Sequence, residues 1–187
     1  MSRTLDILIA ALALAIFSPI LLAAAIAIKL TSAGPVIYRQ RRVGLGGREF
    51  EMWKLRTMVQ GSDPVGVGKV VYRDDPRVTA PGRLLRRTSL DELPNFVNVL
   101  RGEMAIVGPR PTIKAQVDDY TPRQKRRHEV LPGITGWAQA QGRAGIPWEE
   151  RIELDLWYVE HRSAALDLRI LARTAWLVVT GHGLAPD

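Results

Sequence analysis

The chain has 187 residues and no cysteine, which excludes a disulfide framework and thiolate metal sites. Its 26 Lys and Arg against 19 Asp and Glu give a net charge of +7, which favours anionic partners such as phospholipid surfaces or phosphorylated substrates. The length fits one domain plus a membrane element.

Residues 5–28 are almost wholly apolar and predict a membrane helix. At 1.5 Å per residue the segment would extend roughly 36 Å, which is enough to cross a bilayer. No small-residue cleavage site follows it, so we expect the segment to stay in the membrane. Ser18 and Pro19 lie in its middle, where proline bends a helix and a serine hydroxyl can satisfy a freed carbonyl.

Basic residues flank this apolar segment on both sides, and positive charge favours the cytoplasmic face of a membrane. A re-entrant helix that bends at Ser18-Pro19 would leave both ends on that face, whereas an ordinary kinked helix would span the bilayer. The flanking cations are Arg3 before the segment and Lys29, Arg39, Arg41 and Arg42 after it.

The glycine-rich run at 44–47 predicts a hairpin connection, and residues 49–58 alternate as a strand does. The two-residue period of a strand puts Lys54 and Arg56 on one face, so we expect these cations to project together. Solvated surface charge is the simplest interpretation of the pair.

The most distinctive stretch, residues 89–111, reads SLDELPNFVNVLRGEMAIVGPRP and carries adjacent carboxylates at Asp91 and Glu92. Residues 104–107 predict a short strand, and Arg110 follows it in a rigid turn between two prolines. An acidic pair among arginines indicates a site for a charged group, and phosphate suits guanidinium forks best. The arginines before the pair, on an expected helix, are Arg83, Arg86 and Arg87.

Two helix starts fit this stretch. Ser89 and Glu92 have capping-box spacing, although Pro94 would then fall one turn into the helix. A start at Asp91 puts Pro94 in the first turn, where its missing donor costs little. In both registers the carboxylates lie at the positive end of a helix dipole, and Gly102 is the expected stop.

The remaining elements are predicted from composition and period. The basic run at 123–127 is expected to be a solvated face that can hold anionic lipid. Residues 147–161 and 166–179 predict helices, the second with a broad apolar surface. Aromatic residues here suit a membrane interface and core packing equally; they are Trp157, Tyr158 and Trp176.

Several long blocks, taken in order, resemble the signature of the bacterial sugar transferases, the monotopic phosphoglycosyl transferases. With the N-terminal apolar segment, the resemblance covers nearly the whole chain and is far more specific than a lone short motif. The blocks are KLRTM at 54–58, DPRVT at 75–79, GRLLRRTSLDELPNFVNVLRGEMAIVGPRP at 82–111, PGITGWAQAQGR at 132–143 and WEERIELDLWYVEH at 148–161.

The resemblance implies an α+β, membrane-associated fold. A re-entrant, kinked membrane helix over residues 1–30 would be followed by a compact catalytic domain over residues 31–187, with short strands and amphipathic interfacial helices. The expected location is the cytoplasmic face of the bacterial inner membrane. The implied reaction moves a sugar phosphate from a UDP-sugar to polyprenol phosphate, with undecaprenol phosphate as the expected lipid, and releases UMP.

The family's catalytic Asp-Glu dyad matches Asp91 and Glu92. Asp91 is expected to be the nucleophile that forms an aspartyl phosphosugar, and both carboxylates are expected to hold Mg²⁺. The cations expected to bind substrate phosphates are Lys54, Arg56, Arg86, Arg110 and Arg143.

Two other functions use the same features. A non-catalytic basic module that binds anionic lipid fits the charge and the anchor, but gives no reason for adjacent carboxylates among arginines. A metal-dependent lipid diphosphate phosphatase would use the same side chains with water as the acceptor. Nucleic-acid binding is disfavoured by the membrane segment and by the lack of a recognition motif.

Overall fold

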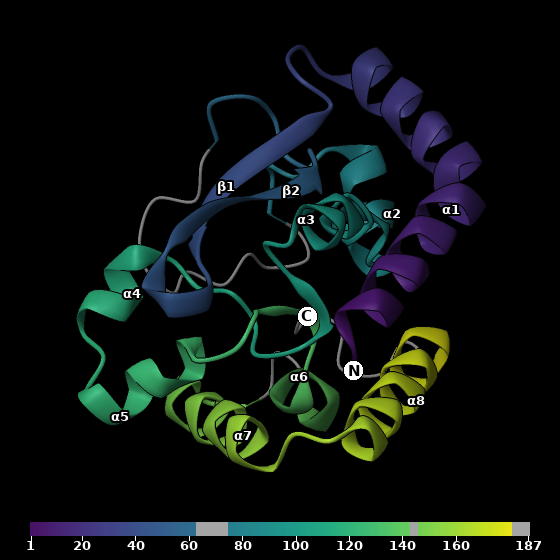
Figure 1. Cartoon of the computed structure of the whole chain (residues 1–187). Coiled ribbons are helices and arrows are strands. Elements are labelled where there is room, and N and C mark those ends of the chain that lie inside the picture. Colours follow the sequence, from purple (N-terminus) through teal and green to yellow (C-terminus); the bar gives the residue numbers. More distant parts are fainter. Residues whose placement is uncertain (63–74, 143–145, 181–187) are drawn as a thin grey trace.

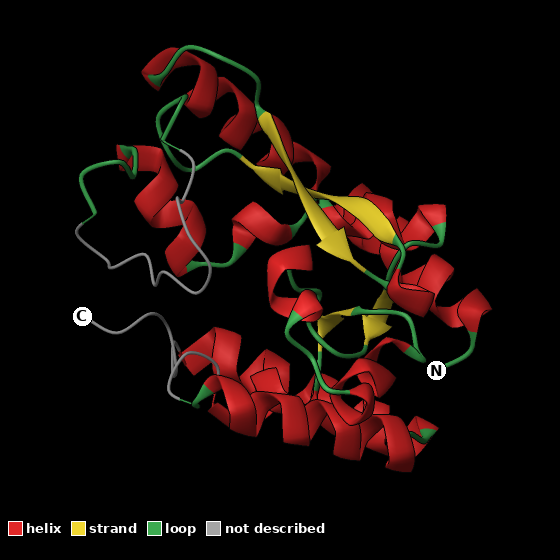
Figure 2. Cartoon of the chain, turned by 90° about the vertical axis from the view of Figure 1, so that its left-hand side faces the viewer, coloured by secondary structure: helices red, strands yellow, loops and turns green. Residues whose placement is uncertain are grey.

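The computed structural model describes residues 1–62, 75–142 and 146–180, in which helices surround two small sheets (Figure 1, Figure 2). The mixed helix and sheet content agrees with the predicted α+β class. The elements, in chain order, are α1 Arg3–Thr31, β1 Ile37–Val43, η1 Leu45–Gly47, β2 Glu49–Leu55, α2 Ala80–Arg87, η2 Leu90–Glu92, α3 Asn95–Arg101, β3 Ala105–Val107, α4 Lys114–Asp118, α5 Pro122–Lys125, η3 Arg126–His128, β4 Gly133–Thr135, α6 Trp137–Gly142, α7 Trp148–His161 and α8 Ala164–Thr180.

The two sheets have two strands each. β1 and β2 form an antiparallel hairpin whose register runs from Ile37 opposite Leu55 to Val43 opposite Glu49, and β3 pairs with β4 in parallel. The connection η1 confirms the predicted glycine turn. Gly46 and Gly47 adopt φ angles of 63° and 76°, in the left-handed region that glycine enters without steric cost.

Helix α1 continues through Pro19, and Figure 1 shows that it changes direction about midway. Proline has no N–H to donate to the carbonyl four residues earlier, which belongs to Ala15. The Ser18 hydroxyl donates to that carbonyl at 2.8 Å, as the sequence predicts. The bend suits a re-entrant course, which stays a prediction.

Both halves of α1 pack on the globular part, while large apolar side chains along the length of the helix stay exposed. Ala10 is fully buried in the central cluster with Val99, and Ile28 packs in a second cluster with Leu85. The helix is long and apolar enough to cross a bilayer. Its large exposed side chains are Leu5, Ile7, Leu8, Leu12, Ile16, Ile20, Leu22, Ile26 and Leu30.

Two polar side chains fasten the start of α1 to the core. The Arg3 guanidinium donates to the carbonyls of Met104, at 3.1 Å, and Val99. The buried Asp6 carboxylate accepts the Ile106 amide at 3.1 Å. Arg3, whose charge predicts the membrane orientation, therefore also has a structural role.

Helices α7 and α8 confirm the two predicted C-terminal helices, but their aromatic residues differ in use. Tyr158 is 4% exposed and its hydroxyl donates to the Asp167 carboxylate at 2.8 Å, so it is a core residue and not an interfacial one. Trp157 and Trp176 are 40% and 54% exposed. This exposure is compatible with the predicted interfacial position of the two tryptophans, which stays a prediction.

The prediction of a solvated face at 123–127 is wrong for its last residue. Arg127 is 2% exposed because η3 turns it inward against α7, where it forms an ion pair with Asp155. Its guanidinium also donates to the Tyr120 hydroxyl at 2.6 Å and to the Arg110 carbonyl at 3.0 Å. Arg127 therefore supports the turn that carries Arg110.

Acid is expected to destabilise the fold through His128. Burial, with the adjacent Arg127 charge, lowers the pKa of this histidine to about 4 from an ordinary 6.5. Between these values the unfolded chain binds a proton that the folded chain does not, so stability falls as pH falls from 6.5 to 4. Relative to His128→Phe, we expect the free energy of unfolding of the wild type to fall by up to about 2 kcal/mol between pH 6.5 and pH 4.

Chemical denaturation in detergent micelles at a series of pH values measures this difference. Other groups titrate in both proteins, so the difference between the two curves isolates His128. Parallel curves for the wild type and His128→Phe would contradict the prediction.

Candidate active site

The carboxylate pair lies on the short turn η2, between α2 and α3. Both predicted helix starts are wrong, because α3 begins at Asn95 with Pro94 as its cap. Ser89 adopts a left-handed φ of 57° and its side chain caps nothing, so the capping box does not form. Pro94 ends one turn and starts the next, where its missing N–H needs no partner. Gly102, with φ of 84°, ends α3 as predicted.

Glu92 is held by two cations from distant parts of the chain. The Lys54 ammonium, from β2, donates to Oε1 at 2.8 Å. The Arg110 guanidinium, from the turn after β3, donates to Oε1 at 2.5 Å and to Oε2 at 3.3 Å. Burial alone would raise the pKa of Glu92, but Arg110 and Lys54 outweigh burial and lower it far below the ordinary range. Glu92 is therefore a fixed carboxylate.

Asp91 lies in a different environment. Among the interactions of the described residues, no hydrogen bond or ion pair engages its carboxylate. Burial, and then the negative charge of Glu92, raise the pKa of Asp91 to about 6, while Lys54, Arg86 and Arg110 oppose the rise. At neutral pH the Asp91 carboxylate is mostly ionised and its oxygens are unengaged, which is the state a nucleophile or a metal ligand needs.

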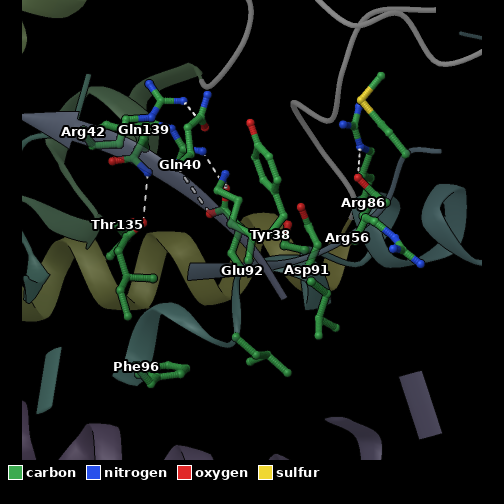
Figure 3. A pocket seen from close by; sticks show the side chains of 18 of the residues that line it. Tyr38, Gln40, Arg42, Arg56, Arg86, Asp91, Glu92, Phe96, Thr135 and Gln139 are labelled. Carbon is green, nitrogen blue, oxygen red and sulfur yellow. Dashed lines mark hydrogen bonds and ion pairs between the residues drawn. The ribbon is translucent and has the colours of Figure 1, made fainter. Parts of the chain in front are cut away.

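The dyad lines a cavity of about 850 Å³ (Figure 3). This volume is in the range of sites that enclose a small-molecule ligand. Polar side chains surround the carboxylates, whereas part of the wall is apolar. The apolar part comes from Phe96, Ile134 and Ala138, together with Leu177 and Val178 of α8.

The structure brings four of the five predicted phosphate-binding cations to this cavity, in different roles. Lys54 and Arg110 hold Glu92. Arg86 donates to the Thr57 hydroxyl at 2.8 Å, and its charge acts on Asp91. The fifth, Arg143, lies outside the described residues.

Arg56 also lines the cavity, but it does not join Lys54 at the dyad. Its guanidinium donates to the Ser32 carbonyl at 2.8 Å and to the Ser32 hydroxyl at 2.9 Å, where α1 ends. Its Nε and Nη1 are buried and have no partner in the described part of the chain. β2 ends at Leu55, so the strand period that predicts a shared face with Lys54 stops one residue before Arg56.

Sequence reasoning missed one side of the cavity. Tyr38, Gln40 and Arg42 share a face of β1 and line the wall beside Arg110. The two-residue period of a strand could have found them, because it puts residues 38, 40 and 42 on one face. Trp148 and Gln139, from α7 and α6, complete this side.

The donor set limits how Mg²⁺ could bind here. The described residues contain no group of three or more metal-ligating side chains. Both oxygens of Glu92 already accept hydrogen bonds from cations, whereas those of Asp91 are free to coordinate. Magnesium is commonly held by one or two carboxylates, waters and substrate phosphates. The site fits that arrangement with Asp91 as the protein ligand, and the prediction of Glu92 as a second ligand has less support.

Comparisons with known proteins identify the family of this chain. The family model described as "Bacterial sugar transferase" matches residues 1–181. The "Uncharacterized sugar transferase EpsL" of Bacillus subtilis (strain 168) is 43% identical over 184 residues, covering 98% of this chain and 90% of that protein. A UDP-glucose:undecaprenyl-phosphate glucose-1-phosphate transferase of Caulobacter vibrioides is 46% identical, covering 95% of this chain and 69% of that protein.

Other relatives are longer than this chain. The UDP-glucose:undecaprenyl-phosphate glucose-1-phosphate transferase of Escherichia coli (strain K12) is 46% identical over 187 residues, but the match spans only 39% of that protein. The match nevertheless covers 94% of this chain. The chain therefore belongs to the bacterial sugar transferase family, and it is a transferase.

Proposed function

We propose that the protein is a monotopic phosphoglycosyl transferase, which moves a sugar phosphate from a UDP-sugar to polyprenol phosphate and releases UMP. The observation that carries the proposal is the asymmetry of the dyad: two cations hold Glu92, while no described residue bonds to the Asp91 carboxylate. Relatives named as UDP-glucose:undecaprenyl-phosphate transferases support undecaprenol phosphate as the acceptor.

In the first displacement an Asp91 carboxylate oxygen attacks the sugar-bearing phosphorus. The phosphorus–oxygen bond to UMP breaks, its electron pair stays on the UMP oxygen, and an aspartyl phosphosugar forms. Arg86 beside Asp91, and Arg110 beside Glu92, supply positive charge where the phosphoryl oxygens would lie. Dividing the reaction in this way means that the nucleotide diphosphate and the lipid phosphate need not occupy the cavity at the same time.

In the second displacement a phosphate oxygen of the lipid attacks the same phosphorus. The acyl phosphate bond breaks, Asp91 regains its carboxylate and the polyprenyl diphosphate sugar is released. Glu92, held by Lys54 and Arg110, keeps both cations aligned through the two steps. No net proton transfer to Asp91 is required.

The membrane segment supports an acceptor that stays in the lipid. Both halves of α1 contact the same globular part, which suits a helix that enters and leaves one face of the membrane. A helix that crossed the bilayer would carry its ends to opposite faces. We therefore propose the re-entrant arrangement at the cytoplasmic face of the bacterial inner membrane, where the nucleotide sugar is dissolved and the lipid phosphate is exposed.

Removing divalent metal is expected to abolish turnover, with full recovery on adding Mg²⁺. A bound Mg²⁺ would neutralise charge on the substrate phosphates. Because Asp91 is the one unengaged carboxylate of the dyad, we expect Mg²⁺ to bind weakly without nucleotide and more tightly with UDP-sugar. Calorimetric titration with and without a UDP-sugar measures this, and full turnover in EDTA would contradict it.

Intact-protein mass spectrometry tests the function. Wild-type protein in micelles, incubated with a UDP-sugar but no lipid, is expected to gain the mass of one sugar phosphate and to release one UMP. Adding polyprenol phosphate should remove the added mass and form the lipid product. Phosphate release from a lipid diphosphate, with no need for nucleotide sugar, would instead support the phosphatase.

A further inference from the structure

Arg42 is a cation of the cavity that has no anionic partner among the described residues. Lys54 and Arg110 are both paired with Glu92. Arg42 instead donates through Nη2 to the Gln40 side chain at 2.7 Å, and its Nε is buried without a partner. A partly desolvated guanidinium without an anionic partner is energetically unfavourable. Binding an anion beside Arg42 would offset this desolvation cost.

Arg42 lies on the side of the cavity away from Asp91. Figure 3 shows Arg42 on one side of Glu92 and Asp91 on the other, with Arg86 beyond Asp91. The electrostatic neighbours agree with this order. The charges that act on Arg42 include Arg110 and Glu92, whereas those that act on Arg86 include Asp91. Burial and the Arg110 charge lower the pKa of Arg42 to about 10, which leaves it a cation at neutral pH.

The two displacements require a phosphate-binding position on this side of the cavity. At phosphorus, the attacking and departing oxygens lie roughly in line. In the first step Asp91 attacks and UMP departs from the opposite side. In the second step Asp91 departs, so the lipid phosphate must attack from the position that UMP has left. One phosphate-binding position, across the phosphorus from Asp91, therefore has to serve both substrates in turn.

We propose that Arg42, held by Gln40, forms this shared position and binds first the phosphate of UMP and then the phosphate of the lipid acceptor. The inference rests on the proposed function and adds to it the residue that receives the leaving group. Arg110 lies near Arg42 and could also bind this phosphate, but its guanidinium is paired with Glu92. Arg42 has a donor that a phosphate can use, since its Nη1, unlike the buried Nε, is accessible and donates no hydrogen bond within the described part of the chain.

The test compares Arg42→Gln with Arg41→Gln, its exposed neighbour on the same strand. Binding of UMP in the presence of Mg²⁺, measured by calorimetry in micelles, needs no turnover. We expect Arg42→Gln to weaken UMP binding and to raise the KM for polyprenol phosphate, each by about 10- to 100-fold. Arg41→Gln should change both by less than about twofold. Arg42→Lys keeps the charge without the fork and should recover part of the loss.

Two outcomes would overturn the inference. If Arg42→Gln binds UMP as the wild type does, Arg42 does not receive the nucleotide phosphate. If UMP binding weakens but the KM for polyprenol phosphate is unchanged, the position is not shared. Failure of the proposed function is distinct, because wild-type protein would then form no adduct from a UDP-sugar. Thermal unfolding of each variant separates lost binding from lost folding.

Discussion

Asp91→Asn is expected to abolish the covalent sugar-phosphate adduct and to lower turnover by about 10⁴-fold or more. An amide oxygen is a poor nucleophile and cannot form the acyl phosphate that carries the sugar phosphate. The substitution changes volume little, and no described residue bonds to the Asp91 carboxylate, so folding should be retained. Intact-protein mass spectrometry and UMP release measure the two effects.

Asp119→Asn is the matched control, since Asp119 is exposed and distant in sequence from the dyad. It should form adduct and turn over at the wild-type rate. Glu92→Gln provides a contrast: it loosens Lys54 and Arg110, so it should slow turnover while leaving some adduct. Adduct formation and UMP release by Asp91→Asn would show that the nucleophile lies elsewhere.

Arg127→Met is expected to destabilise the fold by about 3–5 kcal/mol. The change leaves the buried Asp155 carboxylate without its cation, and it removes the hydrogen bonds to the Tyr120 hydroxyl and the Arg110 carbonyl. The turn that carries Arg110 would lose its support, so we also expect lower activity at temperatures at which the variant is still folded. Denaturant unfolding in micelles, together with UMP release, measures both.

Two comparisons make this prediction specific. Arg123→Met removes an exposed pair with Glu153 and should leave the free energy of unfolding nearly unchanged. The double variant Arg127→Met, Asp155→Leu removes both buried charges and should recover much of the lost stability. Equal effects of Arg127→Met and Arg123→Met would contradict the assigned role of the buried pair.

Elements specified by neighbouring residues were predictable from the sequence. The apolar run that forms α1, the glycines that join β1 to β2 and the Gly102 stop of α3 each follow from local chemistry. Adjacent carboxylates among arginines located the site for the same reason. Such signals depend on residues a few positions apart, and these contacts form whatever the rest of the fold does.

Features that depend on tertiary contacts were not predictable. The capping box at Ser89 fails because Glu92 binds Lys54 and Arg110, which lie 38 and 18 residues away. The inward direction of Arg127 depends on α7, because a basic run alone does not indicate which member is buried. Arg42 was counted only as a flanking charge, since the cavity beside it forms only when β1 meets the Arg110 turn.

The position of α3 has a consequence for how this enzyme can be altered. The helix packs along α1, and only Leu93 and Pro94 separate the dyad turn η2 from its first residue, Asn95. Arg3 and Asp6, at the start of α1, bond to the backbone of residues 104 and 106, just after α3 ends. Helix α1 therefore does more than hold the protein at the bilayer. A generic hydrophobic helix in its place could still bind the bilayer, but it would lack the surface on which α3 and the dyad turn pack.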